Sequence, residues 1–223
     1  MAASASARNT PADVNAFWFG DEWLSNRAAL STPEYFGPAV MGRWYGGGAE
    51  SDAKCAAFAD LIRAAGKGEL QDAPGWGTTP EARLATVVLL DQLSRGAFRG
   101  TPEAFAYDDA AIATTLAAVD AGQDAGMSPA ERQFLYMPLM HSEERALHAR
   151  AMTLFAALAK SFPSLSSMAF ALKYEQEHAA VVERFGRYPH RNVARGRVTT
   201  PEEAEWLAGP DVPAWAKSQQ AAK

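Results

Sequence analysis

The stretch Leu84-Ala-Thr-Val-Val-Leu-Leu-Asp-Gln-Leu93 is apolar on almost every side when it is wound into an α-helix. A helix that lacks a broad polar face is buried over most of its surface. Just upstream, Thr79-Pro80 places a capping hydroxyl before a proline that suits the first helical position. The stretch therefore predicts a central helix over residues 79–97, against which the rest of the chain packs.

The same start signal recurs outside this helix, at Thr101-Pro102, Ser128-Pro129 and Thr200-Pro201. Two of these signals are full capping boxes, because Glu131 and Glu203 follow the capping hydroxyls at the required spacing. Alternating strand patterns bounded by hairpin turns are nearly absent. We therefore predict an all-α fold with helices near 11–24, 51–65, 79–97, 101–121, 128–135, 142–161, 164–185 and 200–208.

Helices of this length joined by short turns predict stacked antiparallel helical hairpins, either a bundle or a helical-repeat-like superhelix. The longest segment predicted to be irregular, residues 31–48, contains two prolines and several aromatic residues that we expect to fold back onto the core. We predict a disordered N-terminal tail over residues 1–12, a single helical domain over 13–215 and a loose C-terminal tail over 216–223.

The composition of the 223-residue chain excludes some classes of partner. Its net charge of −5 provides no basic surface for a phosphate backbone, so we expect no nucleic-acid partner. No apolar run approaches membrane-spanning length, and the N-terminus lacks the apolar region of a secretory signal. Because Cys55 is the only cysteine, it cannot form an intramolecular disulfide. These features predict a cytoplasmic protein without a membrane partner.

Polar residues interrupt the apolar central helix at Asp91 and Gln92. Arg95 lies four residues after Asp91, at the spacing of a helical ion pair. One interpretation is a buried Asp91–Arg95 ion pair, in which the two side chains neutralise each other's charge within the core. The other is that Arg95 and Arg99 line the rim of a cavity.

A second apolar stripe, on the helix that follows Pro163, is interrupted by Glu175 and His178. The Glu-x-x-His spacing occurs in helical bundles that hold metals, and His141-x-x-Glu144 has a similar offset. Such metal sites need more inward-facing carboxylates than the sequence supplies, so we assign no metal ligand. The other interpretation is a core imidazole that is hydrogen-bonded to the neighbouring carboxylate, which would poise His178 as a general acid or base.

The run Phe134-Leu-Tyr-Met-Pro-Leu-Met-His-Ser-Glu143 predicts a turn, because Pro138 disfavours helix at the preceding residue. Ser142 is placed to cap the next helix, which would leave His141 just outside a helix N-terminus. At the positive end of a helix dipole a histidine tends to stay neutral and backbone N–H groups can receive an anion. His148, further along, is predicted to lie on the surface.

The run Arg184-Phe-Gly-Arg-Tyr-Pro-His-Arg-Asn192 concentrates three arginines within eight positions, with Gly186 placed to end a helix. These cations repel one another unless each meets a carboxylate, a carbonyl or a bound anion. The run is therefore either a structural hub, in which acidic side chains such as Glu175, Glu177 and Asp91 neutralise the arginines, or part of an anion-binding pocket.

These motifs resemble the bacterial family known as domain of unknown function 924. The resemblance runs from Phe17-Trp-Phe19 through Leu90-Asp-Gln-Leu-Ser-Arg95 and the two motifs just quoted to Thr200-Pro-Glu-Glu203. The family tends to read Asp-Gln-Phe-Pro-Arg-Asn where this chain has Leu93, Ser94 and Gly96, so only a role for an asparagine at position 96 is put in doubt. The resemblance implies an all-α, tetratricopeptide-like fold and no established activity.

Our leading hypothesis is an interhelical pocket, lined by arginine and histidine, for an anionic or carbonyl-bearing small molecule. The alternatives are a scaffold that binds a partner protein along a concave face and, third, a metal-dependent enzyme. The sequence indicates no cofactor or oligomeric state and leaves open whether the protein is an enzyme. The candidate catalytic residues are His141, His178 and Glu175, and the candidate ligand-binding residues are Asp91, Gln92, Arg95, Arg99, Tyr136, Glu143, Arg184, Arg187, Tyr188, His190, Arg191 and Asn192.

Overall fold

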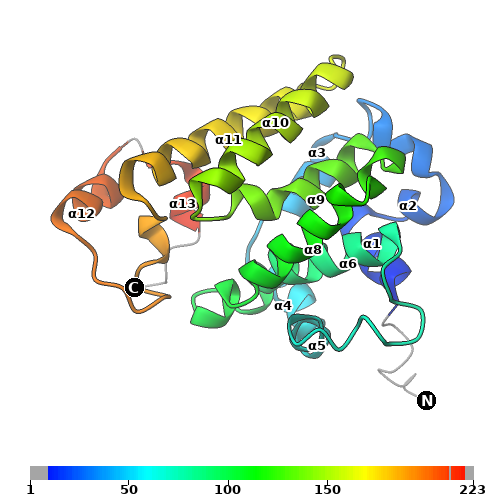
Figure 1. Cartoon of the computed structure of the whole chain (residues 1–223), viewed down its shortest axis with the longest axis horizontal. Helices are drawn as coiled ribbons and strands as arrows, with labels where there is room; N and C mark the ends of the chain where they lie inside the picture. Colours follow the sequence, from blue (N-terminus) through cyan, green and yellow to red (C-terminus); the bar gives the residue numbers. More distant parts are fainter. Residues whose placement is uncertain (1–9, 211, 219–223) are drawn as a thin grey trace.

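A computed structural model describes residues 10–210 and 212–218, and within these ranges the chain is all-α, as predicted (Figure 1). The N-terminal third forms short helices that turn back on one another: α1 (Pro11–Phe19), α2 (Glu22–Ser25), η2 (Arg27–Ser31), α3 (Pro38–Tyr45), α4 (Ala49–Ala56) and α5 (Ala59–Gly66). The remaining elements are α6 (Pro80–Val87), η3 (Val88–Leu93), α7 (Ser94–Ala97), η4 (Pro102–Phe105), α8 (Asp108–Asp120), η5 (Gln123–Gly126), α9 (Pro129–Met140), α10 (Arg145–Ser161), α11 (Ser166–Phe185), η6 (Pro189–Arg191), α12 (Pro201–Ala208) and α13 (Ala214–Ser218).

The predicted central helix is α6 together with η3 and α7. Leu84, Leu89 and Leu93 are fully buried, and α6 packs against α1, α8 and α9. In the middle, Val88–Leu93 forms a π-helical turn. A π-turn fits an extra residue into the helix and is frequent at functional sites. Asp91 and Gln92, which the sequence singled out, lie in this turn, although the π-turn itself was not predicted.

Helices α9, α10 and α11 form the second half of the core. Helix α10 packs against both neighbours and lies beside α11 over most of its length in Figure 1. Short connections make α10 antiparallel to α9 and to α11, so α9 and α11 run in the same direction. The C-terminal elements η6, α12 and α13 lie around the far end of α11, at the left of Figure 1.

Several predicted boundaries shift. The helix predicted over 11–24 breaks at Gly20, whose φ of 93° is a left-handed conformation that favours glycine. Residues 31–48, predicted to be irregular, contain α3, which begins at Pro38. Ser128 and Thr200 form the predicted capping boxes with Glu131 and Glu203.

The largest correction is at Pro138, which lies inside α9 instead of ending it. Its ring removes one helical hydrogen bond, but Met137, Pro138 and Leu139 are all buried, and the packing of this helix offsets that loss. The next helix begins at Arg145, three residues later than predicted, and the Ser142 hydroxyl accepts a hydrogen bond from the Glu144 backbone N–H, ahead of that helix.

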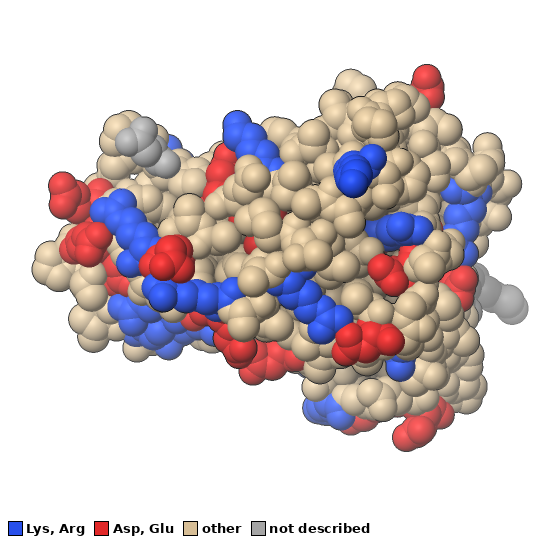
Figure 2. Space-filling view, turned by 45° about the horizontal axis from the view of Figure 1, so that its top comes forward, with Lys and Arg blue, Asp and Glu red and all other residues tan. Residues whose placement is uncertain are grey.

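The C-terminal tail is shorter than predicted. The tail predicted over 216–223 begins within α13, because residues 216–218 are helical and Ala216 is buried; residues 1–9, 211 and 219–223 lie outside the described residues. Figure 2 shows basic and acidic side chains interleaved across one face. No helix of the described part of the chain is long and apolar enough to cross a membrane.

Candidate functional site

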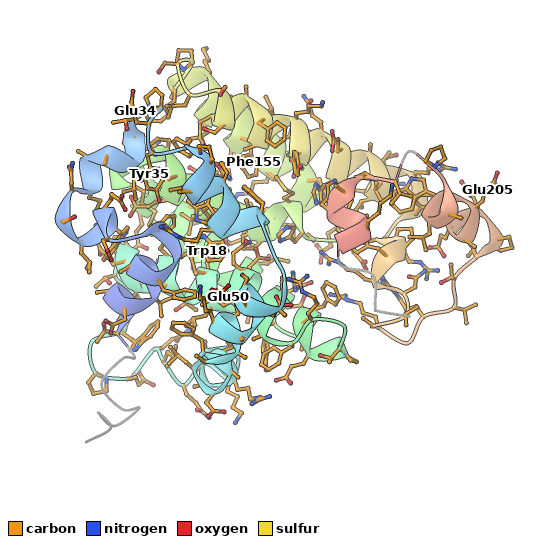
Figure 3. The ribbon with its side chains drawn as sticks, turned by 180° about the vertical axis from the view of Figure 1, so that it is seen from behind. Trp18, Glu34, Tyr35, Glu50, Phe155 and Glu205 are labelled. Carbon is orange, nitrogen blue, oxygen red and sulfur yellow. The ribbon has the colours of Figure 1, made fainter. Side chains whose placement is uncertain are left out.

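A cavity of about 590 Å³ lies between the N-terminal helices and the α9–α11 half of the molecule. Its walls come from segments that are far apart in the sequence: α3, α4, the turn of η3 and α7, η4, α9, α11, η6 and α13. Trp18, labelled in Figure 3, is the lining residue contributed by α1. A volume of this size is typical of small-molecule sites.

Asp91 holds His141 on the cavity wall. The Asp91 side chain is fully buried, and one of its carboxylate oxygens lies 2.7 Å from His141 Nδ1. Burial alone would raise the pKa of Asp91, but His141 and Arg95 more than offset it, so that the pKa is lowered and the carboxylate stays charged. An ionised carboxylate accepts, so Nδ1 donates, and His141 Nε2 has no hydrogen-bond partner among the described residues.

Asp108 on α8 collects three guanidinium groups. Its carboxylate lies 2.7 Å from Arg95, 3.0 Å from Arg191 and 2.8 Å from Arg195. Arg95 also lies 3.5 Å from Asp91 and donates to the Ala104 carbonyl. Asp108 is thus the centre of a buried ionic network directly behind the His141–Asp91 pair.

The network extends to Glu143, which receives two hydrogen bonds from Arg197, at 2.6 and 3.0 Å, and lies 3.9 Å from Arg195. Four guanidinium groups therefore face three carboxylates, which leaves one positive charge in excess. The members are Arg95, Arg191, Arg195 and Arg197 with Asp91, Asp108 and Glu143.

Arg191 is the most enclosed member of the network, with 3% of its surface exposed. Its Nη1 donates to Asp108 at 3.0 Å and to the His141 carbonyl at 2.9 Å. The guanidinium group lies between the rings of Phe105 and Tyr188, 5.0 and 4.5 Å from their centroids. Nε is buried without a partner. Burial lowers the pKa of Arg191, and Arg95 adds to this effect although Asp108 opposes it.

Two further imidazoles border the same end of the cavity. His178 Nδ1 donates to the Tyr174 carbonyl at 2.7 Å, and its ring stacks on Trp215 with centroids 3.7 Å apart. The rings of His178 and His141 are 5.9 Å apart. Burial lowers the pKa values of both His178 and His190 well below the ordinary range, so both imidazoles are neutral.

The predicted partnership of Glu175 with His178 is wrong. Glu175 instead lies 2.8 Å from His148 Nδ1, and His148, predicted to be on the surface, is buried. His148 Nε2 donates to the Ser142 carbonyl at 2.9 Å. Glu175 therefore belongs to a buried pair behind the cavity wall and not to the wall itself.

The prediction that His141 lies at a helix N-terminus is also wrong, because it caps the C-terminal end of α9. The free carbonyls there are each satisfied by a side chain: Met140 by the Tyr188 hydroxyl at 2.6 Å, His141 by Arg191 and Ser142 by His148. The helix dipole at this end favours positive charge, which matches the guanidinium beside it.

The structure divides the candidate residues into two groups. Those that line the cavity are Asp91, Gln92, Arg95, Arg99, His141, His178, His190 and Arg191. The others are engaged elsewhere: Tyr136 with Asp124, Glu143 with Arg197, Glu175 with His148, Arg184 with Glu202, Arg187 and Asn192 with Glu203, and Tyr188 with the Met140 carbonyl.

The sequence-based selection missed the apolar and aromatic part of the wall. These residues are Met41, Trp44, Tyr45, Met137, Phe170, Tyr174 and Trp215. The aromatic content of residues 31–48 was a usable signal for Trp44 and Tyr45, but nothing in the sequence pattern connected these residues to α11. Among the described residues, no group of three or more His, Cys, Asp or Glu is arranged to hold a metal ion.

Comparison with known proteins agrees with the resemblance seen in the motifs. Residues 14–211 match the model of a family described as "Bacterial protein of unknown function (DUF924)". The fold is similar to that of a protein of unknown function, ATU0120 from Agrobacterium tumefaciens, at 34% identity and a TM-score of 0.70, over 89% of this chain and 96% of that one. No curated protein is significantly similar to the chain. The chain belongs to the DUF924 family of bacterial proteins.

Proposed function

We propose that the cavity binds a small molecule through an anionic or carbonyl oxygen, and that His141 acts on this molecule as a general acid or base. The observation that carries the proposal is Arg191, a nearly fully buried guanidinium group on the cavity wall whose Nε has no partner. Buried polar groups are nearly always paired, and the described residues supply no acceptor for Arg191 Nε, so a ligand oxygen bound at this cavity-lining residue would satisfy a donor that is otherwise unpaired.

The charge balance supports an anion over a neutral ligand. The network around Asp108 has one more guanidinium than carboxylate. Arg195 and Arg197 keep 33% and 21% of their side chains exposed, so the charge with least access to water lies on Arg95 and Arg191, where a bound anion would be most favourable. The two donors that remain on Arg191, Nε and Nη2, form the edge to which a carboxylate binds with two parallel hydrogen bonds. Neutral His178 and His190 add no competing positive charge.

The chemistry proposed for His141 rests on its pairing with Asp91. A carboxylate that accepts from Nδ1 fixes the ring tautomer and leaves the Nε2 lone pair to accept a proton. The Asp91–His141 distance of 2.7 Å is suited to this role. An imidazole held in this way can exchange a proton with a ligand bound at Arg191.

The alternative of a protein-binding scaffold predicts a broad groove and no deep pocket. The 590 Å³ cavity, with its buried arginine and histidines, favours a small-molecule site instead. The metal-dependent alternative has no supporting cluster within the described residues.

The binding proposal is tested by ligand-observed NMR with phenylacetate and its neutral analogue 2-phenylethanol. We expect the wild-type protein to bind phenylacetate, and Arg191→Met to weaken that binding by roughly tenfold or more, the usual size of a charge-assisted hydrogen bond. Arg184→Met is the matched control, because Arg184 pairs with Glu202 away from the cavity. Unchanged phenylacetate binding by a folded Arg191→Met variant would contradict the proposal.

The acid–base proposal is tested by the tautomer of His141, which long-range ¹⁵N NMR reports directly. We expect a proton on Nδ1 and none on Nε2 in the wild-type protein, and a loss of this preference in Asp91→Asn. A proton that resides on Nε2 in the wild-type protein would overturn the role of Asp91. His178, whose Nδ1 donates to a backbone carbonyl, is the internal control that Asp91→Asn leaves unchanged.

A further inference from the structure

One face of α11 lines the cavity from end to end. Its lining residues are Ser167, Phe170, Ala171, Tyr174 and His178, and each has another of them three or four positions away, as residues on one helical face do. From Phe170 to His178 this face extends about 12 Å at 1.5 Å per residue. The wall therefore changes from aromatic to imidazole along its length.

Helix α9 runs in the same direction and also leads to an imidazole. Its lining residues run from Gln133 through Met137 to His141, again about 12 Å along the axis. The two imidazole ends coincide, because the rings of His141 and His178 are 5.9 Å apart. The opposite end is marked by Tyr45, whose hydroxyl accepts from Gln133 Nε2 at 2.8 Å. The cavity is thus elongated, with its imidazoles at one end.

The cavity opens at its aromatic end. Tyr45 and Phe170 both line it, yet 49% and 47% of their surfaces are exposed. At the other end Trp215 stacks on His178, and His190 is buried. Large aromatic side chains at a rim give an apolar ligand chain surface against which to pack.

The wall between the two ends is mostly uncharged. Met41, Trp44 and Met137 line it, and the charged pair beside them, Arg99 and Asp52, is mutually bonded at 2.7 and 2.9 Å. Arg43 also borders the cavity and is exposed to solvent. The middle of the cavity therefore suits a hydrocarbon chain or an aryl group.

We infer that the ligand is an amphipathic monocarboxylate, with its carboxylate at Arg191 and an apolar tail directed toward Tyr45 and Phe170. A wall of about 12 Å accommodates a tail of roughly seven to nine carbon atoms. The inference rests on the proposed function, because Arg191 holds the head group, and it adds the identity and direction of the rest of the molecule.

The test compares butanoate, octanoate and octan-1-ol by isothermal titration calorimetry with the full chain. Each buried methylene strengthens binding by about fourfold, so we expect octanoate to bind at least about 30-fold more tightly than butanoate. Octan-1-ol, which lacks the charge, should bind at least about tenfold more weakly than octanoate. Equal affinities for butanoate and octanoate would overturn the inference.

Phe170→Ala tests the direction of the tail. It should weaken octanoate binding by about three- to tenfold, the loss expected for part of an aromatic contact, and change butanoate binding by less than about twofold. Leu24→Ala is the control, because Leu24 is 63% exposed and does not line the cavity. An equal effect of Phe170→Ala on both acids, or none on octanoate, would contradict the inference.

The two proposals fail in different ways. If both acids bind with equal strength and Arg191→Met weakens both, the anion site stands and the apolar tail is wrong. If Arg191→Met leaves octanoate binding unchanged, or octan-1-ol binds as tightly as octanoate, the head-group assignment is wrong and the proposed function fails with it.

Discussion

Arg187 and Arg191 lie four residues apart in one motif, yet the structure uses them differently. Arg187 donates to both carboxylate oxygens of Glu203, at 2.6 and 2.9 Å, and to the Val198 carbonyl. Arg191 shares Asp108 with two other arginines and keeps Nε unpaired beside a cavity. A cluster of arginines in sequence can thus contain a structural ion pair and a candidate binding group side by side.

The supply of carboxylates explains the difference. Near α12, Glu202 and Glu203 supply one carboxylate each to Arg184 and Arg187. Around Asp108, four guanidinium groups share three carboxylates. The α12 region is a closed structural network, and the cavity wall is an open one. If the contrast holds, substitutions in the two networks should change the stability of the fold by different amounts.

The largest effect is expected for Asp108→Asn, which removes the carboxylate and preserves the side-chain shape. The variant leaves Arg191 with no carboxylate and Arg95 with only Asp91. Breaking a buried ion pair from one side costs about 3–5 kcal/mol, so we expect the free energy of unfolding to fall by that amount. Urea denaturation followed by circular dichroism measures it.

The neighbouring residue provides the control. Asp109 is exposed on the same helix, and Asp109→Asn should change the free energy of unfolding by less than about 0.5 kcal/mol. If Asp108→Asn lowers the free energy of unfolding by no more than Asp109→Asn does, Asp108 does not stabilise the buried guanidinium groups. The contrast between open and closed networks then disappears.

A smaller decrease in the free energy of unfolding is expected for Glu203→Gln, which affects the closed network near α12. Arg187 lowers the pKa of Glu203 from 4.5 to about 2, although burial opposes it. Because the folded-state pKa is below the unfolded one, this stabilisation is fully present above pH 4.5 and is lost as the pH falls toward 2. A shift of this size corresponds to at most about 3–4 kcal/mol.

The measurement is the free energy of unfolding of wild type and Glu203→Gln at several pH values between 3 and 7. The difference between the two proteins should be about 2–3 kcal/mol at neutral pH and should shrink as the pH falls below 4.5. Glu202→Gln is the control, because that side chain is 61% exposed. A difference that stays constant with pH would show that the Glu203 charge is not the source of the stability.

The fold was largely predictable because its strongest signals are local. The apolar segment 84–93 identified the buried helix, and the capping boxes at Ser128 and Thr200 marked two helix starts. The failures occurred where tertiary packing overrides local preference. Pro138 remains in α9 because a buried helix offsets one lost hydrogen bond.

The site was only partly predictable, because sequence spacing does not rank partners from different helices. Glu175 lies three residues before His178 but bonds His148 from α10. Likewise, the aromatic residues Tyr45 and Phe170 meet the same cavity from α3 and α11. No sequence pattern indicates which arginine of the motif finds a full complement of acceptors, since that depends on how η6 and α12 are placed.

The smallest effect is expected for Arg184→Ala. Arg184 belongs to the same motif as Arg191 but lies on the surface. Arg184 and Glu202 are 3.0 Å apart with side chains 53% and 61% exposed, and exposed ion pairs contribute about 0–1 kcal/mol. We expect a loss of less than about 0.5 kcal/mol in urea denaturation and no change in phenylacetate binding. A loss as large as that of Glu203→Gln would mean that the whole run from Arg184 to Asn192 acts as one structural hub. In that case the division between its surface arginines and Arg191, on which the binding proposal depends, would not hold.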